Sequence, residues 1–452
     1  MDIKIFSLRS LKSVKDALKK IDNNHHGCVI ICDDQNKVLG IATDGDIRRQ
    51  LIINQDLNQK IDNCMNINFI SVFEDSSHED IYKKFDSDIN ILPVLNKKNQ
   101  LTAVYTKDNI PFRGEVKTSS RAKSPVRISF GGGGSDTTTF FSQFDGAVIN
   151  ATISLYSYAS LFKRDDKKIL IDSLDLNKKV MLESIENLEN LDKEFGLIKA
   201  VIKTIKPKFG FDLIINSDFP RGSGLGGSSA ICSAIIGCFN EFRIDKWNSY
   251  EIAEIAYESE RLQLDVAGGW QDQYATVFGG FNFMEFRDSQ NLIHPLRLSE
   301  DTLSELENNL ILCYTNMSHK DDGIHRTQKS NTSKAKVINN IKQNVLLCYK
   351  TRNTLLRGEL NEFGTLLDDA WQLKKTFSKE ISNKYLDNIY NGALKNGATG
   401  GKLLGAGGGG FFVFYVKAKE KINFLKWLIS QELKHTYFKF VSNGLNTWLT
   451  RE

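Results

Sequence analysis

The sequence predicts an α/β (α+β) chain, with a small repeat domain first and a larger mixed α/β region after it. Three observations favour this architecture. An apolar run, a glycine-rich turn and a small-residue helix follow one another at residues 211–239. Two further glycine clusters adjoin predicted strands, and an internal repeat occupies residues 1–112. The 452 residues are enough for two or three domains of ordinary size.

The composition is that of a globular protein, with 41% hydrophobic and 25% charged residues. A net charge of +4 is too small for this length to indicate a nucleic-acid or acidic-membrane partner. No uninterrupted apolar stretch is long enough to span a bilayer, and the N-terminus lacks the apolar core of a signal peptide. The seven cysteines are scattered, which favours reduced core thiols. We therefore expect a soluble cytoplasmic protein.

The N-terminal region contains two copies of one pattern. Residues 29–47 align without a gap with residues 92–110, at an offset of 63 residues, the separation of Thr43 from Thr106. Each copy is typical of a strand, a polar turn, a second strand and a helix start. Residues 113–123 then form a polar, charged stretch, for which the sequence predicts a linker.

The central feature of the second domain, which begins at residue 124, is the turn F-P-R-G-S-G-L-G-G-S-S-A at residues 219–230. Its glycines permit a positive φ and let a ligand approach the backbone. Ser228 and Ser229 fall where a helix begins, and the free N–H groups there attract an anion such as phosphate. The alternative is a turn that only packs a helix on a strand. A dinucleotide site is set aside because residues 247–264 favour a helix over a second strand.

Two carboxylates lie beside glycines. Asp136 ends the run S-P-V-R-I-S-F-G-G-G-G-S-D, where it could accept hydrogen bonds from sugar hydroxyls, with Arg127 as a nearby positive charge. Alternatively, it caps the helix through Phe140. Asp272 stands in G-G-W-Q-D-Q-Y, where it could accept a hydroxyl proton. The alternative for Asp272 is a helix-capping aspartate on the surface.

The residue types favour phosphoryl transfer. The third glycine cluster, N-G-A-T-G-G-K-L-L-G-A-G-G-G-G-F-F, fills residues 396–412. The sequence has no Ser–His–Asp grouping at a nucleophile elbow and no Cys/His metal spacing. Phosphoryl transfer needs positioning and charge neutralisation more than a nucleophilic side chain, so three glycine clusters and one aspartate suit it.

Residues 124–452 resemble the GHMP small-molecule kinases in three motifs, which occur in the family's order. They are P-V-R-I-S-F-G-G-G-G-S-D, P-R-G-S-G-L-G-G-S-S-A and G-G-K-L-L-G-A-G-G-G-G-F. The run from Gly268 to Phe286 brings the likeness closer to the D-glycero-D-manno-heptose 7-phosphate kinases of bacterial surface-polysaccharide synthesis. The resemblance implies two lobes with ATP and sugar between them. Residues 124–300 would resemble the second domain of a small-subunit ribosomal protein, and residues 301–452 would be ferredoxin-like.

The same resemblance implies ATP and Mg²⁺ as cofactors and a sugar phosphate as the acceptor. The implied ATP-binding residues are Gly222, Ser223, Gly224, Leu225, Gly226, Gly227, Ser228 and Ser229. The implied substrate-binding residues are Arg127, Gly132, Gly133, Asp136, Gly405, Gly407 and Gly408. Asp272 would orient or deprotonate the anomeric hydroxyl. Ser229 and Glu260 would hold Mg²⁺, with Glu258 as the alternative to Glu260.

Residues 1–112 resemble a tandem pair of CBS domains, which implies an adenosine nucleotide as a regulatory ligand. The residues that match the family's nucleotide-contacting pattern are Gly40, Thr43 and Asp46, whereas the second copy has Ala103 and Asn109 at the corresponding glycine and aspartate positions. The alternative is a structural or homodimerising module that binds no ligand.

Two other functions stay open. One is the same chemistry on another sugar, such as fucose or galactose, and the other is a nucleotide-sensing protein without kinase activity. An acceptor that already carries a phosphate needs basic residues at the far end of its pocket. Arg127 and Lys402 are candidates for that role.

Overall fold

The computed structural model describes residues 3–85, 89–110, 118–317 and 335–451, and the chain divides into two compact units, Met1–Val116 and Lys117–Glu452. The predicted linker 113–123 is too long, because residues 118–123 already belong to a strand of the second unit. The rest of that linker lies outside the described residues. Among the described residues, no helix combines the length and the apolar character that a membrane span requires.

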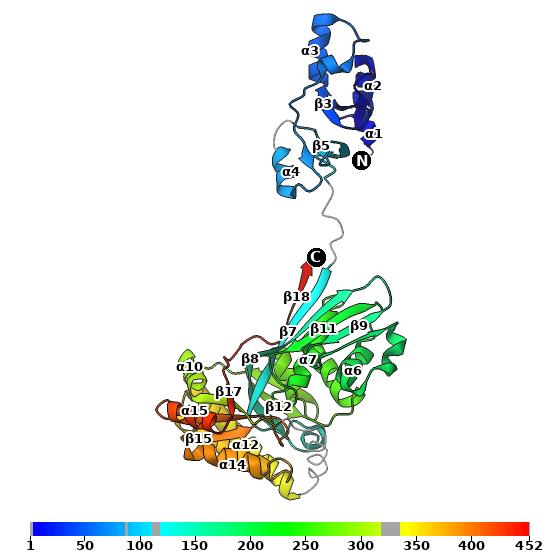
Figure 1. Cartoon of the computed structure of the whole chain (residues 1–452). Helices are drawn as coiled ribbons and strands as arrows, with labels where there is room; N and C mark the ends of the chain where they lie inside the picture. The colour runs from blue at the N-terminus through cyan, green and yellow to red at the C-terminus, as the bar shows by residue number, and fades with distance from the viewer. Residues whose placement is uncertain (1–2, 86–88, 111–117, 318–334, 452) are drawn as a thin grey trace. The chain divides into compact units, whose positions relative to one another are not determined.

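The first unit contains two small three-stranded sheets, ordered β1-β2-β3 and β4-β5-β6 (Figure 1). Its first half consists of α1 (Ile3–Phe6), β1 (Ser7–Arg9), α2 (Val14–Asn24), β2 (Cys28–Cys32), β3 (Val38–Thr43), α3 (Asp44–Asn54) and η1 (Ile61–Cys64). Its second half consists of β4 (Val72–Phe73), α4 (His78–Lys84), β5 (Ile91–Leu95) and β6 (Leu101–Thr106). In each half the first strand runs parallel to the second, and the second runs antiparallel to the third.

The two halves repeat each other in detail, which confirms the internal repeat. The pairing of β2 with β3 shifts register between Ile31 and Cys32, and the pairing of β5 with β6 shifts between Val94 and Leu95. Each hairpin also turns through an asparagine in the left-handed region, a conformation that asparagine tolerates better than most residues. Both features recur at the spacing that the sequence alignment gave.

The second unit begins with a lobe built on an eight-stranded sheet, ordered β10-β9-β11-β8-β12-β13, in which β7 pairs with β8 and β18. Its strands are β7 (Thr118–Gly131), β8 (Gly146–Lys163), β9 (Ile169–Ser173), β10 (Lys178–Leu182), β11 (Phe211–Ser217), β12 (Phe281–Arg287) and β13 (Gln290–Pro295). Its helices are α5 (Thr138–Phe141), η2 (Ile185–Asn190), η3 (Lys193–Phe195), α6 (Gly196–Ile205), α7 (Gly227–Asn240), α8 (Ser249–Tyr257), η4 (Glu258–Gln263) and α9 (Gln271–Phe278). Figure 1 shows α6 and α7 packed on one face of this sheet.

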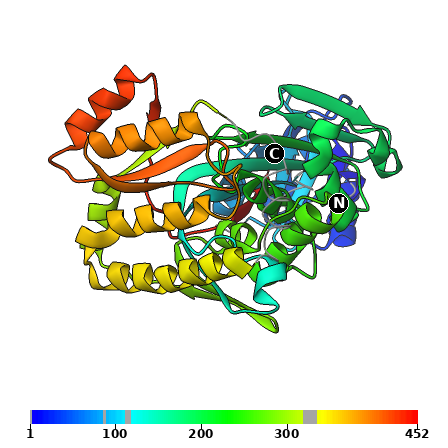
Figure 2. The ribbon, with the colours of Figure 1, turned by 90° about the horizontal axis from the view of Figure 1, so that it is seen from below.

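The second lobe contains a four-stranded sheet ordered β15-β16-β14-β17. Its elements are α10 (Glu300–Asn309), β14 (Leu310–Tyr314), α12 (Ala335–Arg357), η5 (Leu360–Glu362), α13 (Phe363–Lys375), α14 (Lys384–Lys395), β15 (Ala398–Leu403), β16 (Phe411–Val416), α15 (Lys421–Ser430) and β17 (Lys434–Thr436). In Figure 2, β15 and β16 lie between α14 and α15 on one side and α12 and α13 on the other. The chain then returns to the first lobe, where β18 (Asn446–Arg451) pairs with β7. The expectation that the C-terminal lobe extends to residue 452 is therefore wrong.

One hydrophobic core joins the two lobes. Every residue of β16 is buried, because helices cover both faces of its sheet. Phe412 and Phe414 pack with α14 and α15, whereas Phe411 and Val413 pack with β7 and β8 of the first lobe. This shared core lies beside the cleft between the two lobes and packs them against each other.

Candidate active site

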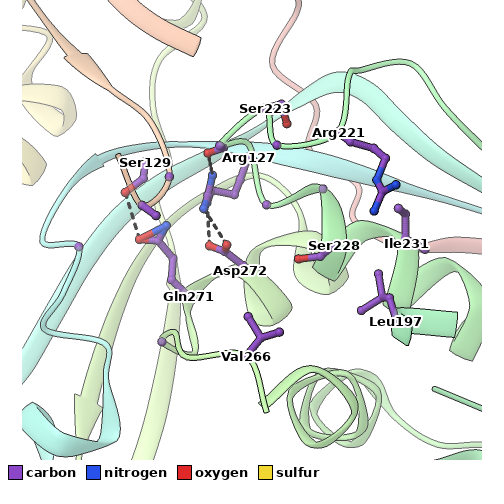
Figure 3. Close-up of a pocket in the computed structure, with 18 of the residues that line it drawn as sticks. Arg127, Ser129, Leu197, Arg221, Ser223, Ser228, Ile231, Val266, Gln271 and Asp272 are labelled. Carbon is purple, nitrogen blue, oxygen red and sulfur yellow. Dashed lines mark hydrogen bonds and ion pairs between the residues drawn. The ribbon is translucent and has the colours of Figure 1, made fainter. Parts of the chain in front are cut away.

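A cleft of about 640 Å³ lies between the two lobes of the second unit. The first lobe contributes the last part of β7, the starts of α7 and α9, and the turn before α7. The second lobe contributes side chains from α12, α13 and β15. Figure 3 shows Ser129 and Gln271 at one end of the pocket and Arg221 and Leu197 at the other. Asp272 lies between the two ends, so the cleft can hold two ligands with this carboxylate between them.

The central glycine-rich turn ends at an uncapped helix N-terminus. Helix α7 has Gly226 at its N-cap, with a φ of 78°, and no side chain caps it. Gly222 and Gly224 also have positive φ, as the sequence predicted. A Cβ on Gly224 would stand 2.6 Å from the carbonyl oxygen of Leu404 in the other lobe, so only glycine fits there. The free N–H groups of this terminus make an anion site that faces the cleft.

Arg127 holds Asp272 in a two-point ion pair. The Arg127 Nε and Nη2 groups donate to the two carboxylate oxygens over 2.8 and 2.7 Å, and Nη1 donates to the carbonyl oxygen of Gly224 over 2.7 Å. Arg127 is buried, and the Asp272 side chain is 22% exposed. This geometry fixes the direction of the carboxylate beside the turn. The alternative of a surface helix cap for Asp272 is wrong, because Trp270 is the N-cap of α9.

Asp136 is a buried carboxylate of the same lobe, close to Asp272. It accepts hydrogen bonds from the backbone N–H groups of Gly134, over 3.0 Å, and Gln271, over 3.2 Å. Burial, together with the negative charge of Asp272, raises the pKa of Asp136. The alternative that Asp136 caps the helix through Phe140 is wrong, because Thr137 occupies that N-cap. Asp136 instead ties the start of α9 to the first glycine cluster.

Ser229 and Glu260 lie together, as expected for a shared metal site. The Ser229 hydroxyl donates to Glu260 Oε2 over 2.6 Å, and Gln273 Nε2 donates to the same oxygen over 2.6 Å. Glu260 belongs to the π-helical segment η4, a distortion that often marks functional sites. It is 1% exposed and contacts Ser229, whereas Glu258 is only half-buried and has no such contact, which favours Glu260.

The donor set of this pair suits Mg²⁺. One carboxylate and one hydroxyl are hard oxygen ligands, and Mg²⁺ in kinases takes one or two such groups together with substrate phosphates. Neither Ser229 nor Glu260 lines the cleft, but Ser228, the neighbour of Ser229, does. No group of three His, Cys, Asp or Glu side chains is suitably placed for a metal within the described part of the chain. Phosphate oxygens would therefore have to complete the coordination.

Besides Ser229 and Glu260, four expected contact residues do not line the cleft. Leu225 is buried in the shared core, and a Cβ on Gly132 would stand 1.9 Å from the carbonyl oxygen of Ala147. Gly407 packs against Ile381 in the same way, and Gly408 donates its N–H to the Ile381 carbonyl over 2.9 Å. These residues serve backbone packing. The expected residues that do line the cleft are Arg127, Gly133, Asp136, Gly222, Ser223, Gly224, Gly226, Gly227, Ser228, Asp272 and Gly405.

The structure adds side chains from the second lobe that no motif indicated. Asn344 in α12 donates to the carbonyl oxygen of Gly133 over 3.1 Å, and Lys374 in α13 enters the cleft beside Lys402 in β15. Asn344 and Lys374 are buried polar residues, each on an amphipathic helix. A polar side chain in the apolar stripe of an amphipathic helix was the only sequence signal for Asn344 and Lys374.

The expected nucleotide residues of the first unit are engaged in a helix cap. The Thr43 hydroxyl accepts the N–H of Asp46 over 3.1 Å, and the Asp46 carboxylate accepts the N–H of Thr43 over 2.9 Å. Arg49 also pairs with Asp46. These bonds form a capping box at the start of α3.

Models of known families match three parts of the chain. The model of the GHMP kinases N terminal domain matches residues 196–280, that of the GHMP kinases C terminal domain matches residues 352–426, and that of the CBS domain matches residues 1–53. The CBS match covers the first of the two structural repeats.

Similar proteins cover the second unit almost completely. The D-glycero-alpha-D-manno-heptose 7-phosphate kinase of Campylobacter jejuni is 39% identical over 337 residues, which are 73% of this chain and 98% of that protein. The crystal structure of a D-glycero-D-manno-heptose 1-phosphate kinase from Bacteroides thetaiotaomicron is 30% identical and superposes with a TM-score of 0.61 over 73% of this chain and 98% of that one. A putative sugar kinase from Campylobacter jejuni is 35% identical, also with a TM-score of 0.61, over 75% of this chain and 100% of that one.

These matches agree with the site. The uncapped α7 terminus, the Arg127–Asp272 pair and the cleft between two lobes provide an anion site beside a fixed carboxylate, which is what phosphoryl transfer from ATP to an alcohol requires. With two family models matched in order and a relative 39% identical over nearly its whole length, this chain belongs to the GHMP kinase family, with a CBS domain at its N-terminus.

Proposed function

We propose that the chain transfers the γ-phosphoryl group of ATP to the anomeric hydroxyl of D-glycero-D-manno-heptose 7-phosphate, giving the 1,7-bisphosphate for surface-polysaccharide precursors. The 39% identity to the heptose 7-phosphate kinase over 98% of that protein carries this proposal. A kinase that consumes ATP on this route is expected to work in the cytoplasm.

The cleft offers separate places for the two substrates. We assign the ATP phosphates to the free N–H groups at Gly226, Gly227 and Ser228, because a helix N-terminus favours bound anions. The acceptor is assigned to the end marked by Ser129 and Gln271, on the far side of Asp272 (Figure 3). Ser229 and Glu260 would hold Mg²⁺, which supplies charge neutralisation to the transferred group when bound.

Asp272 would aim the acceptor hydroxyl at the γ-phosphorus. The hydroxyl oxygen forms a bond to phosphorus as the bond from phosphorus to the bridging oxygen of ADP breaks, and the hydroxyl proton passes to the Asp272 carboxylate. The pair with Arg127 keeps that carboxylate directed into the cleft. A loose transition state makes only a weak demand on the base, so orientation is the main contribution expected of this residue.

The names of the two heptose kinases differ in the position of the substrate phosphate, and a panel of substrates tests both positions. ADP release would be measured with heptose 7-phosphate, heptose 1-phosphate, the free heptose, fucose and galactose, and the product would be assigned by phosphorus NMR. We expect the 7-phosphate to give the highest kcat/KM and a phosphorylated C1. A higher value for fucose or galactose would contradict the heptose assignment, and no ADP with any acceptor would favour a nucleotide-sensing protein.

We propose that an adenosine nucleotide binds the first unit near Thr43 and Asp46. The match of a CBS domain model to residues 1–53 supports this. Because both side chains already cap α3, a nucleotide would have to share or replace those bonds. Titration of AMP and ATP, with kinase rate and oligomeric state as readouts, tests the binding and the possible homodimer. A chain whose rate and mass do not change with either nucleotide would refute a regulatory role.

A further inference from the structure

Two lysines are buried in the wall of the cleft without an acidic partner. Lys374 is 9% exposed and Lys402 is 3% exposed, and both line the cleft. Within the described ranges, neither forms an ion pair with a carboxylate. A buried ammonium group without a counter-charge is costly, so the arrangement calls for a negative ligand.

The hydrogen bonds of these lysines leave donors free for that ligand. Lys402 Nζ donates to the carbonyl oxygen of Ser129 over 3.0 Å. Lys374 Nζ donates to the carbonyl oxygens of Leu403, over 2.9 Å, and Gly405, over 2.5 Å. An ammonium group has three N–H donors, so two on Lys402 and one on Lys374 have no acceptor among the described residues.

Electrostatics supports the same interpretation. Burial, with the nearby charge of Arg127, lowers the pKa of Lys402 to about 8. Burial and the charge of Lys402 lower the pKa of Lys374. Burial and neighbouring positive charge therefore disfavour the ammonium form of each lysine, and a bound anion would favour it.

The position of Lys402 indicates which anion. Its bond to Ser129 places it at the acceptor end of the cleft, where the Ser129 hydroxyl donates to Gln271 over 3.1 Å. The opposite end carries its own cation, Arg221, and the anion site of α7 lies between them (Figure 3). Arg127 is a poorer candidate for the phosphate ligand, since Asp272 already neutralises its charge and three of its five N–H donors have protein acceptors.

We propose that Lys402, with Lys374 beside it, binds the phosphate group that the acceptor sugar already carries, and so selects phosphorylated sugars over free ones. This inference rests on the proposed function, because it assumes an acceptor with a phosphate. The γ-phosphate of ATP offers the same chemistry, and the kinetic test separates the two sources.

The test compares Lys402→Met with the wild-type full chain. Methionine keeps an unbranched apolar stem and removes the charge. Apparent KM values for heptose 7-phosphate and for ATP, and kcat/KM for heptose 7-phosphate and for the free heptose, would be measured by ADP release. The matched control is Lys417→Met, which removes an exposed lysine that follows β16 and lies outside the cleft lining.

We expect Lys402→Met to lower the ratio of kcat/KM for the phosphorylated acceptor to that for the free one by about 10- to 100-fold, the range for losing a charge-assisted hydrogen bond. Lys402→Arg should restore part of that ratio, and Lys417→Met should keep it. An unchanged ratio, or a rise confined to the KM for ATP, would overturn the inference. The melting temperature of ligand-free Lys402→Met should match or exceed that of the wild type, because an unpaired buried charge is gone.

Binding of inorganic phosphate tests the subsite without any sugar. Calorimetric titration into ADP-saturated enzyme should show weak binding by the wild type that Lys402→Met loses by at least about tenfold. Equal binding by both would overturn the inference even if the kinase prefers another sugar. Conversely, a wild type inactive on every heptose with intact phosphate binding would refute the proposed function alone.

Discussion

Arg127 and Lys402 are both buried cations in the wall of one cleft, and they differ in their partners. Arg127, on β7 of the first lobe, makes a two-point ion pair with Asp272 and a third bond to the glycine-rich turn. Lys402, on β15 of the second lobe, donates a hydrogen bond to one backbone carbonyl oxygen, that of Ser129. The first cation holds the Asp272 carboxylate in place before any ligand arrives. The second keeps donors free, which suits a group that meets its partner only when substrate binds.

The other charged groups near the cleft differ between the two lobes in the same way. On the first lobe Glu260 accepts bonds from Ser229 and Gln273, and Asp136 accepts two backbone N–H groups. On the second lobe Lys374 repeats the pattern of Lys402, with carbonyl partners and no carboxylate among the described residues. We therefore expect the paired groups of the first lobe to position other residues, and the unpaired lysines of the second lobe to bind a ligand.

The largest effect on activity is expected when Asp272, the carboxylate paired with Arg127, is replaced. Asp272→Asn should lower kcat by at least about 100-fold, because an amide neither accepts the hydroxyl proton nor holds Arg127 at two points. It should also lower the free energy of unfolding by about 3 kcal/mol, since Arg127 is left buried and unpaired. Steady-state kinetics and urea unfolding measure the two effects. Asp288→Asn, at an exposed turn, is the control, and near-normal turnover would remove Asp272 from the mechanism.

The Mg²⁺ dependence of the rate tests the second pair of the first lobe, Ser229 and Glu260. Glu260→Gln should raise the Mg²⁺ concentration needed for half-maximal rate and lower the rate at saturation by tens of fold, because a neutral amide is a poorer Mg²⁺ ligand than a carboxylate. Glu258→Gln, two residues away on the same helical segment, is the matched control. The same magnesium dependence in both variants would show that the Ser229–Glu260 contact only supports packing.

The pH dependence of kcat/KM tests the role of Lys402, the unpaired lysine of the second lobe. Because the pKa of Lys402 is about 8, its charge falls roughly tenfold between pH 7 and pH 9, and kcat/KM for the sugar phosphate should fall with it. Arg127, Lys374, Asp136 and Cys348 are the titratable and charged groups near Lys402, and Lys374 loses its charge in the same direction. Lys402→Met should flatten this part of the profile. A steep fall that persists in the variant would assign it to another group.

The same shift has a consequence for stability with a definite sign. Lys402 has a lower pKa in the folded chain than its ordinary value of 10.5, so between about pH 8 and 10.5 the unfolded chain binds more protons. The contribution of Lys402 to the free energy of unfolding should therefore rise with pH in that window and be flat below it. Urea unfolding of the wild type and Lys402→Met across this range measures the difference.

The smallest effect is expected in the first unit, where paired groups cap a helix. Thr43→Val should reduce the local stability of α3 by about 1 kcal/mol, as for other lost caps, without changing the kinase rate in the absence of nucleotide. Amide exchange of residues 44–54 in the full chain measures this. If AMP protects these amides in the wild type and not in the variant, Thr43 has a ligand role in addition to its cap.

Local patterns in the sequence determined the features that depend on neighbouring residues. The repeat at an offset of 63 residues, the positive φ of Gly222 and Gly224, and the helix start at Ser228 were all predictable, because backbone freedom and capping are short-range properties. The same composition favoured substrate contact at Gly407 and Gly408, which in the structure lie against Ile381. A glycine that admits a ligand and one that admits a neighbouring backbone look alike in sequence.

Tertiary structure alone decided which distant groups meet. Arg127 and Asp272 are 145 residues apart, and Lys402 and Ser129 are 273 apart. The return of β18 to β7 likewise joins the last strand to the first of the unit. Such contacts follow from the packing of the two lobes around one core, and neither periodicity nor residue spacing encodes them. The sequence therefore predicted an anion site with a carboxylate beside it, whereas the fold showed which charges in the cleft are paired and which are not.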